Sequence, residues 1–395
     1  MALRSLLILI AGVVMSQFYR SHLAVLGPEL TRDLGAGPAD LGNLSGIWFL
    51  AFALAQIPVG VALDHFGIRR TVTTALGLAV AGAAMFTLAG SVAMALAAQV
   101  VLGMACAPLY MAVVVLIARA WPRERFAAVS GTVLAATNLG MLVSASPLAA
   151  LVGWLGWRGA FGLMTAATLA TMIAVVLGVR EPPMPPRREN LVQAVRGTVS
   201  LIGLKALWPL FPYALIAPAV LIAVRTLWAG PYLDEVYGMA PLDRGHVLGL
   251  MVLAGALAAA VLGWLQYRLG SRRVATASSV AGIAVLIALG IWPAAGIAVT
   301  VALLCGVAFF GATYGMMMAQ GRLFIPEGRE GRGITLLNFF SFLGMALIQA
   351  ASGRLVATAQ SAGLAPEAIY RLLFLTLAGL LAAAVIVYQW SKDRP

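Results

Sequence analysis

Charged residues are scarce in this chain of 395 residues, at 10% of the sequence, whereas 62% of the residues are hydrophobic. A soluble globular domain carries about 25% charged residues, so this composition excludes that class of protein. Cysteine is also rare, since the chain has only Cys106 and Cys305, both within apolar stretches. Two such cysteines exclude a disulfide scaffold, and we expect each to be a small packing residue.

Groups that perform chemistry are equally few. The 14 acidic residues all lie at the ends of apolar stretches or between them, and there are only three histidines. We find no nucleophile paired with a base, no metal-binding cluster and no cofactor motif, so we expect neither an enzyme nor a bound metal or cofactor. The methionines at 316–318 raise a copper-transport hypothesis, but consecutive helical residues point to different sides and make a poor chelate.

Long apolar stretches are what the sequence has in abundance. Twelve of them are long enough to cross a bilayer as helices, which predicts an all-α membrane protein in contact with lipid. They lie near residues 4–28, 40–63, 71–93, 94–118, 126–152, 159–179, 206–233, 242–265, 274–293, 295–320, 333–356 and 367–390.

Basic residues are distributed unevenly between the two sides of these spans. With the N-terminus inside, 19 of the 26 Lys and Arg fall on the cytoplasmic side and five on the other. This asymmetry is typical of inner-membrane topology, so we expect both termini in the cytoplasm of a bacterial cell. The net charge of +12 then reflects topology and not a nucleic-acid partner. The first 25 residues resemble a signal peptide but have no small-residue cleavage site, which favours an uncleaved first helix.

The sequence is an internal duplication. An offset of 203 residues aligns Gly27-Pro28 with Gly230-Pro231 and continues to Arg69-Arg70, which aligns with Arg272-Arg273. The run at residues 181–189 is charged and rich in proline, and it reads as a linker. We therefore predict a six-helix half at 1–180, a cytoplasmic linker at 181–204 and a second half at 205–395. In such duplicated carriers the substrate site lies between the halves near the membrane midplane.

Two arginines interrupt the apolar spans at matching places. Arg20 lies in the first span and Arg225 in the seventh, and they are repeat mates if a slip of two residues is allowed. A charge at the centre of a membrane helix costs roughly 2.5–3.5 kcal/mol, so it is seldom without a role. Two guanidiniums that face each other repel unless an anion lies between them, and their planar donors suit carboxylate or phosphate. The alternative is that each arginine reaches the surface or binds carbonyls freed by nearby prolines.

Four polar residues are candidate companions of these arginines. Gln17 lies one turn before Arg20, and three further spans contribute Tyr110, Asn138 and Tyr314. Each could donate a hydrogen bond to a bound substrate. Each could equally hold two helices together.

One loop carries a family resemblance. Residues 60–70 read GVALDHFGIRR, which resembles the signature of the major facilitator superfamily between helices 2 and 3. Together with twelve spans and a central linker, this implies a two-half transporter that works by alternating access. The resemblance implies that Asp64 braces the cytoplasmic gate at the start of helix 11, near residues 331–333, with help from Arg125. The glycines Gly60 and Gly67 would permit the tight turn. Both arginines of the signature, Arg69 and Arg70, would lie at the lipid headgroups.

The chain departs from that family pattern in three places. His65 replaces a basic residue of the signature, and Tyr267 replaces the acid in the second copy. Gln99, four residues before Gly103, stands where proton-coupled relatives often carry an arginine. This last change disfavours proton-coupled drug efflux.

Within the superfamily, one arginine on helix 1 and one on helix 7 resemble the organophosphate:phosphate antiporters and organic-anion carriers. We therefore predict a monomeric transporter of a small anion, an organic carboxylate or phosphate ester, by exchange or facilitated flux. The alternatives are a proton-coupled carrier of a neutral or cationic metabolite, and a transport-like sensor. His22, near Arg20, is the candidate for proton coupling, because none of the acids lies mid-helix.

Overall fold

The structure is a computed structural model that describes residues 2–180, 196–326 and 329–391. Every regular element in these ranges is a helix, which confirms the all-α prediction. The first half comprises α1 (Ala2–Ser21), α2 (Leu23–Leu34), α3 (Pro38–Thr87), α4 (Val92–Ala120), α5 (Arg123–Val143) and α6 (Ser146–Gly178).

The second half follows after the undescribed residues of the expected linker. It contains two short 3-10 turns, η1 (Ser200–Gly203) and η2 (Lys205–Leu207), then α8 (Leu210–Ala223), the π-helical turn η3 (Val224–Trp228) and α9 (Ala229–Tyr237). The remaining helices are α10 (Pro241–Leu269), α11 (Ser271–Ile291), α12 (Ile297–Phe310), α13 (Tyr314–Leu323), α14 (Glu330–Ser361) and α15 (Pro366–Tyr388). The predicted half boundaries at 180 and 205 stay predictions, because most of the linker lies outside the described residues.

Sharp glycine bends divide the longest helices into spans. α3 turns at Gly67, where φ is 77°, and α6 turns at Gly156, where φ is 68°. Only glycine adopts this backbone region without strain. Ten segments among the described residues are long and apolar enough to cross a membrane. The bend at Gly67 separates the second and third expected spans within α3, and the bend at Gly156 separates the fifth from the sixth. Gly270, the repeat mate of Gly67, has a φ of 89°, so both copies of the loop turn in the same way.

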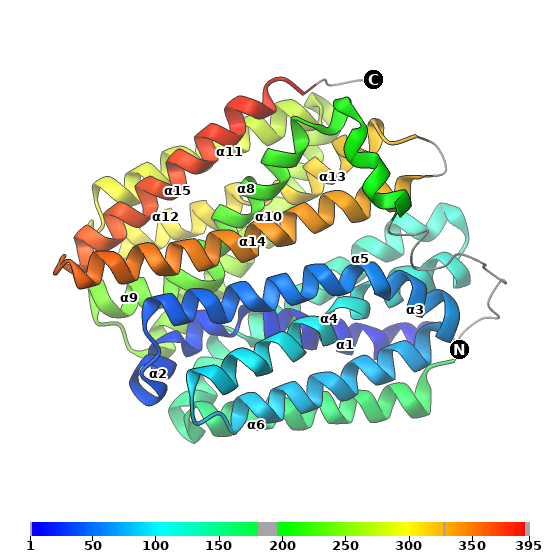
Figure 1. The fold of residues 1–395 in the computed structure, drawn as a ribbon, viewed down its shortest axis with the longest axis horizontal. Coiled ribbons are helices and arrows are strands. Elements are labelled where there is room, and N and C mark those ends of the chain that lie inside the picture. Colours follow the sequence, from blue (N-terminus) through cyan, green and yellow to red (C-terminus); the bar gives the residue numbers. More distant parts are fainter. Residues whose placement is uncertain (1, 181–195, 327–328, 392–395) are drawn as a thin grey trace.

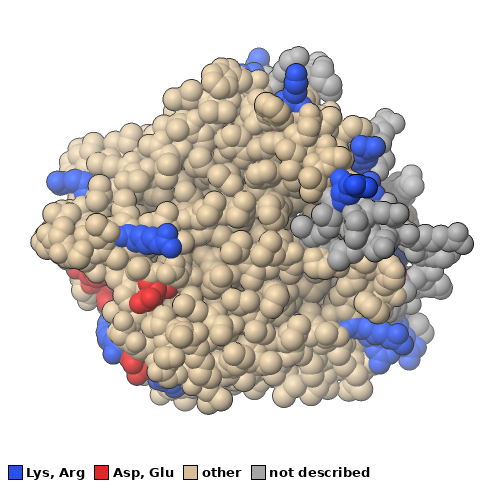
Figure 2. Space-filling view, viewed as in Figure 1, with Lys and Arg blue, Asp and Glu red and all other residues tan. Residues whose placement is uncertain are grey.

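The two halves form two bundles packed side by side, with both chain ends at the same end of the molecule (Figure 1). We call this the terminal end and the opposite end, where α2 and α9 lie, the distal end. On the face drawn in Figure 2, the visible acidic side chains gather toward the distal end, and several basic ones lie near the terminal end. The helices run along one axis, and the acidic side chains visible on this face lie toward one of its ends.

Three of the helix runs break near their middles. The first span breaks between α1 and α2 at His22, the seventh contains the π turn η3, and the tenth breaks at Gly311 between α12 and α13. The π turn ends three residues before Pro231, which has no N–H to donate to the carbonyl of Leu227. Such breaks release backbone groups and commonly lie beside functional sites.

Candidate functional site

Arg20 lies in the last turn of α1, and residues from both halves surround it. Its guanidinium carbon is 5.5 Å from the ring centre of Phe49 on α3 and 5.2 Å from that of Phe342 on α14. One terminal nitrogen is 3.7 Å from the sulfur of Met345, and the Nε atom is buried without a hydrogen-bond partner. Aromatic faces attract a cation but leave its N–H donors unsatisfied. The arginine therefore retains donors for a ligand.

Arg225 lies in the π turn η3 of the second half. Its Nη1 atom would be 3.4 Å from a methyl group added at Gly255 of α10, so the glycine leaves room for the guanidinium. The extra residue in a π turn widens the helix locally and displaces the side chains that it carries. Among the described residues, no carboxylate forms an ion pair with Arg225 or with Arg20.

The two arginines lie near each other and near two tyrosines. Their charges are close enough to repel each other, and Arg20 also interacts electrostatically with Tyr314, which in turn interacts with Tyr110. Tyr314 and Tyr110 are 36% and 39% exposed, so both side chains keep accessible surface. The phenol of Tyr314 also donates a hydrogen bond to Oδ1 of Asn338 on α14.

This cluster repeats the duplication of the chain. Each half contributes one arginine and one tyrosine, and Tyr110 and Tyr314 are separated by the offset of 204 residues. The tyrosines come from the fourth and tenth spans, and the arginines from the first and seventh. Two positions of the repeat, each contributed by both halves, thus lie close together.

The other two candidate ligands lie along the first and fifth spans. Gln17 packs against the fifth span, since a methyl group added at Gly140 would lie 2.9 Å from its Cβ atom. Asn138 is half-buried two residues earlier on that span. Their part in substrate binding stays a prediction.

His22 lies within a cage of aromatic rings inside the first half. It is 1% exposed, and its ring centre is 5.3 Å from that of Phe86 and 5.1 Å from that of Phe161. Its Nδ1 atom is 3.0 Å from the carbonyl oxygen of Tyr19, and its Nε2 atom is 3.1 Å from the amide nitrogen of Gln99. A carbonyl only accepts, so this network assigns the proton to Nδ1 and makes Nε2 the acceptor from Gln99. A neutral ring satisfies both contacts.

The loop of the family signature lies at the terminal end. Asp64 is 3.6 Å from Arg119 of α4, an ion pair within the first half. The expected help from Arg125 stays a prediction. Arg69 donates a hydrogen bond to the carbonyl of Val176, and the side chain of Arg70 is exposed. The expected contact of Asp64 with residues 331–333 stays a prediction for the state in which the terminal end closes.

The signature loop also borders the larger of two described pockets. This groove, of about 990 Å³, lies between α3 and α4, and Pro58, Phe66 and Met104 line it with Arg69 and Arg70. Gly60 lies beside it, with open space where a side chain would be. Arg20, Arg225 and the two tyrosines near them do not line this groove.

At the distal end the duplicated Gly-Pro pairs of the first and seventh spans cross each other. A methyl group added at Gly230 would overlap the carbonyl oxygen of Ala24, whereas one added at Gly27 would lie 3.5 Å from the ring of Pro231, an ordinary contact. The Ala24 carbonyl has no N–H partner one turn later, because that residue is Pro28. The α-hydrogen of Gly230 therefore meets an oxygen that its own helix leaves unbonded.

Two further crossings close the same end. A methyl group at Gly42 of α3 would lie 2.6 Å from the carbonyl oxygen of Gln349 on α14, and Gly353 packs equally closely on α3. A methyl group at Gly245 of α10 would lie 2.7 Å from Cβ of Ala149 on α6. Gly42 and Gly245 are repeat mates, so the duplication supplies a small residue at both of these crossings.

A charge cluster lies beside the crossing of Gly27 and Gly230. Its four residues are Glu29, Arg32, Asp234 and Arg244. Within the first half, Arg32 is 3.0 Å from Glu29, and within the second half Arg244 is 2.5 Å from Asp234. Across the halves, Arg32 is 3.5 Å from Asp234 and Arg244 is 3.6 Å from Glu29. Arg244 is only 2% exposed. The cluster contains two positive and two negative side chains and is neutral.

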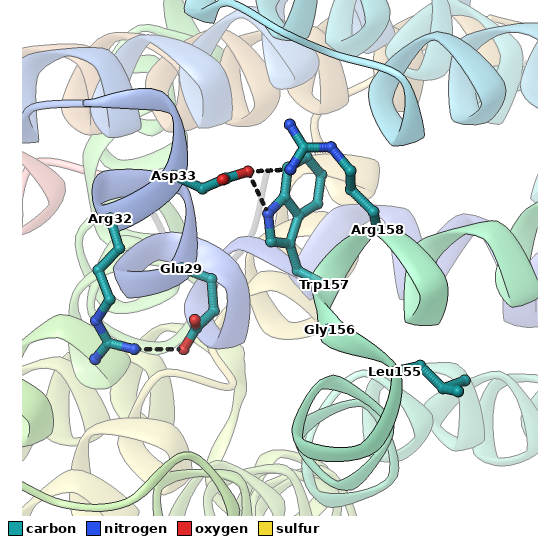
Figure 3. A pocket seen from close by; sticks show the side chains of 7 residues that line it. All are labelled: Glu29, Arg32, Asp33, Leu155, Gly156, Trp157 and Arg158. Atoms are coloured by element: carbon teal, nitrogen blue, oxygen red, sulfur yellow. Dashed lines mark hydrogen bonds and ion pairs between the residues drawn. The ribbon is translucent and has the colours of Figure 1, made fainter.

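A pocket of about 320 Å³ lies beside this cluster (Figure 3). Asp33 accepts hydrogen bonds there from Trp157, at 2.9 Å, and from Arg158. These two donors hold the pKa of the Asp33 carboxyl below its usual range. The contacts connect α2 to the bend at Gly156 within the first half.

Several residues of the site were not predicted from the sequence. Phe49, Phe342, Met345 and Asn338 lie on the second and eleventh spans, where nothing in the local pattern distinguishes a cavity face from a lipid face. The π turn at Arg225 had only its neighbouring prolines as a signal. Gly27 and Gly230 were found as repeat mates, but their meeting required the packing of the two halves.

The fold and this site define a membrane carrier built from two repeated halves. Residues 8–349 match the Major Facilitator Superfamily, and the chain belongs to that family. It is therefore a transporter that works by alternating access between its halves.

Solved structures of similar fold include several transporters. A bacterial homolog to the human lysosomal transporter Spinster, in an inward-facing and unoccupied conformation, has a TM-score of 0.83 at 16% identity, and the match covers 100% of this chain and 98% of that one. The nucleoside transporter NupG has a TM-score of 0.79 at 13% identity, with 97% of each chain covered. A D-xylose-proton symporter has a TM-score of 0.78 at 14% identity, with 99% and 97% covered.

One curated relative matches a short stretch of sequence. The probable galactarate/D-glucarate transporter GudP of Escherichia coli (strain K12) is 35% identical over 51 residues. The match spans 13% of this chain and 11% of that protein.

Proposed function

We propose that the protein transports a small organic anion and binds it between Arg20 and Arg225. The observation that carries this proposal is the pair of interacting guanidiniums from opposite halves with no described carboxylate paired to either. Two like charges in a low-dielectric interior are costly until a counter-ion arrives. An anion neutralises both and satisfies the unpartnered Nε of Arg20.

Two further observations support an organic anion with hydroxyl groups. Tyr110, Tyr314 and Asn338 border the arginines and supply neutral donors and acceptors. The matched stretch of the galactarate/D-glucarate transporter, whose substrates are polyhydroxylated dianions, agrees with two cationic ligands. A dicarboxylate could engage one arginine at each end. Phosphate esters remain the other class that a pair of arginines suits.

The same electrostatics favour exchange of one anion for another. The unloaded carrier must move two unpaired charges between states, whereas the loaded carrier moves a neutralised site. We infer that transport is obligatory exchange or facilitated flux. In this proposal the terminal end faces the cytoplasm of a bacterial inner membrane, as the distribution of Lys and Arg predicts, and the carrier acts as a monomer.

A two-stage experiment tests the proposal. The first stage is a thermal-shift screen of purified protein against galactarate, D-glucarate, other dicarboxylates, phosphate esters and neutral sugars. A ligand at 100 times its dissociation constant adds about 2.7 kcal/mol of stability. We expect shifts with anions and none with neutral sugars. Stabilisation by neutral or cationic compounds alone would contradict the anion site.

The second stage measures flux of the best anion into vesicles. We expect fast counterflow with substrate on both sides and slow uptake with substrate on one side. Accumulation driven by a pH gradient alone, and abolished in His22→Ala, would instead establish proton coupling. Binding without any flux would favour a ligand sensor.

A further inference from the structure

We infer that closure of the distal gate, where the first and seventh spans cross, depends on Gly230. The charge cluster above the crossing acts as a latch that keeps every charge paired in both states. The inference rests on alternating access but not on the nature of the substrate.

Gly27 and Gly230 differ in the space that each leaves for a side chain. Both Gly-Pro pairs lie at the crossing, but only Gly230 meets backbone, at the Ala24 carbonyl, and any side chain there overlaps it. Backbone cannot yield as a flexible side chain can, so a methyl group at 230 must separate the two spans. At Gly27 the same methyl group fits in ordinary contact with Pro231. The two positions are related by the duplication, which makes Gly27 the matched control for Gly230.

The charge cluster contains two contacts within the halves and two between them. The shortest contacts, Arg32 to Glu29 at 3.0 Å and Arg244 to Asp234 at 2.5 Å, lie within single halves and survive separation. The contacts that separation breaks, at 3.5 Å and 3.6 Å, are the longer ones. Removing one partner from a buried ion pair is strongly unfavourable, whereas here no arginine loses its last carboxylate. The two halves can therefore separate at this end without leaving a buried unpaired charge. A gate that opens and closes in every transport cycle requires this.

Replacing Glu29 and Asp234 removes both carboxylates from Arg244. In the closed state Arg244 is nearly inaccessible to water and depends on Asp234 and Glu29 for charge balance. Glu29→Gln with Asp234→Asn leaves that guanidinium buried and unpaired. Opening then hydrates it, so the double variant should favour the open distal end.

The test measures the width of the distal end directly. Spin labels are placed at Leu88 and Leu364, which are exposed at the distal ends of the two halves, after Cys106 and Cys305 have been replaced by alanine. Distances between the labels are measured by pulsed electron resonance without substrate. We expect Gly230→Ala to raise the ratio of open to closed molecules at least about tenfold, equivalent to about 1.4 kcal/mol. Gly27→Ala should match the parent.

The outcomes separate the gate from general damage. Identical distances in Gly230→Ala and Gly27→Ala would overturn the inference. If Gly230→Ala does not fold, Glu29→Gln/Asp234→Asn provides the test, and an unchanged distance distribution in that variant would overturn it. Since no substrate is used, a failure here leaves the proposed anion site untouched, and the failure of every anion to bind leaves this gate untouched.

Discussion

The two halves of the chain place an arginine at matching positions but hold it differently. Arg225 lies over Gly255 of its own half, whereas Arg20 is flanked by Phe342 and Met345 of the other half. The surroundings of Arg20 therefore change when the halves move. The duplication has placed two arginines at matching positions without giving them matching neighbours.

The largest effect is expected from replacing the guanidiniums themselves. Arg20→Lys and Arg225→Lys each keep the charge but lose the planar pair of donors. Loss of one charge-assisted hydrogen bond corresponds to roughly 10- to 150-fold in uptake efficiency. Counterflow in vesicles measures this, with Arg268→Lys, which lies over Trp264 at the terminal end, as the matched control. Near-normal uptake by either variant would contradict bidentate anion binding.

The contribution of the opposite half to Arg20 is tested at Phe342. Phe342→Leu removes an aromatic face 5.2 Å from the guanidinium and keeps an apolar side chain. A cation–π contact contributes about 0.5–2 kcal/mol, so we expect anion affinity to change about 2- to 30-fold. Phe339→Leu on the same helix is the control. Equal effects of the two substitutions would remove the distinction between the two arginines.

Asp64 tests the asymmetry at the terminal end. Its repeat mate Tyr267 is 91% exposed, so only the first half has an acid in this loop. Asp64→Asn should lower turnover several-fold and shift the balance between inward- and outward-facing molecules, with affinity altered only through that shift. Spin-label distances and counterflow give the two readouts. Tyr267→Phe should change neither, and a comparable defect there would show that both loops act as gates.

His22 should affect stability more than transport. His22→Ala leaves a cavity beside Phe86 and Phe161 and leaves the Gln99 amide unpaired, which should cost roughly 2–4 kcal/mol of unfolding free energy. The pH profile of anion exchange should keep its shape. Chemical unfolding and flux at several pH values measure the two effects. A pH profile that flattens in the variant would identify His22 as a proton carrier.

The smallest effect is expected at Asp33, on the exposed side of the first half. Trp157 and Arg158 lower its folded-state pKa, so its contribution to stability is present above the pKa of the unfolded chain and is lost as pH falls through the folded value. Asp33→Asn should therefore slightly lower the melting temperature at pH 7 and leave it unchanged well below about pH 4. An equal loss at both pH values would show that the charge is not responsible.

The sequence predicted the architecture well because membrane helices obey a strong local rule. Apolar length alone located the twelve spans, and the offset of 203 residues located the repeat. The same local rule cannot say which face of an apolar helix meets another helix, so Phe49 and Phe342 went unnoticed. Likewise nothing in the sequence indicated that the end of α4 brings Arg119 to Asp64. Such pairings depend on how each helix is rotated about its own axis in the bundle. The spacing of residues along the sequence does not specify that rotation.

The position of Arg20 has a consequence for how the protein is made. Helix α1 enters the membrane before the other described helices, and its arginine then has none of the partners that surround it in the finished protein. Phe49 follows on the next span, but the sulfur of Met345 lies 325 residues later in the chain. Until the eleventh span arrives, the cost of this charge, roughly 2.5–3.5 kcal/mol at the membrane centre, must be met by the apolar residues of α1 itself. The apolar residues before Arg20 therefore serve insertion as well as packing, and polar substitutions there should lower yield even where the folded carrier tolerates them.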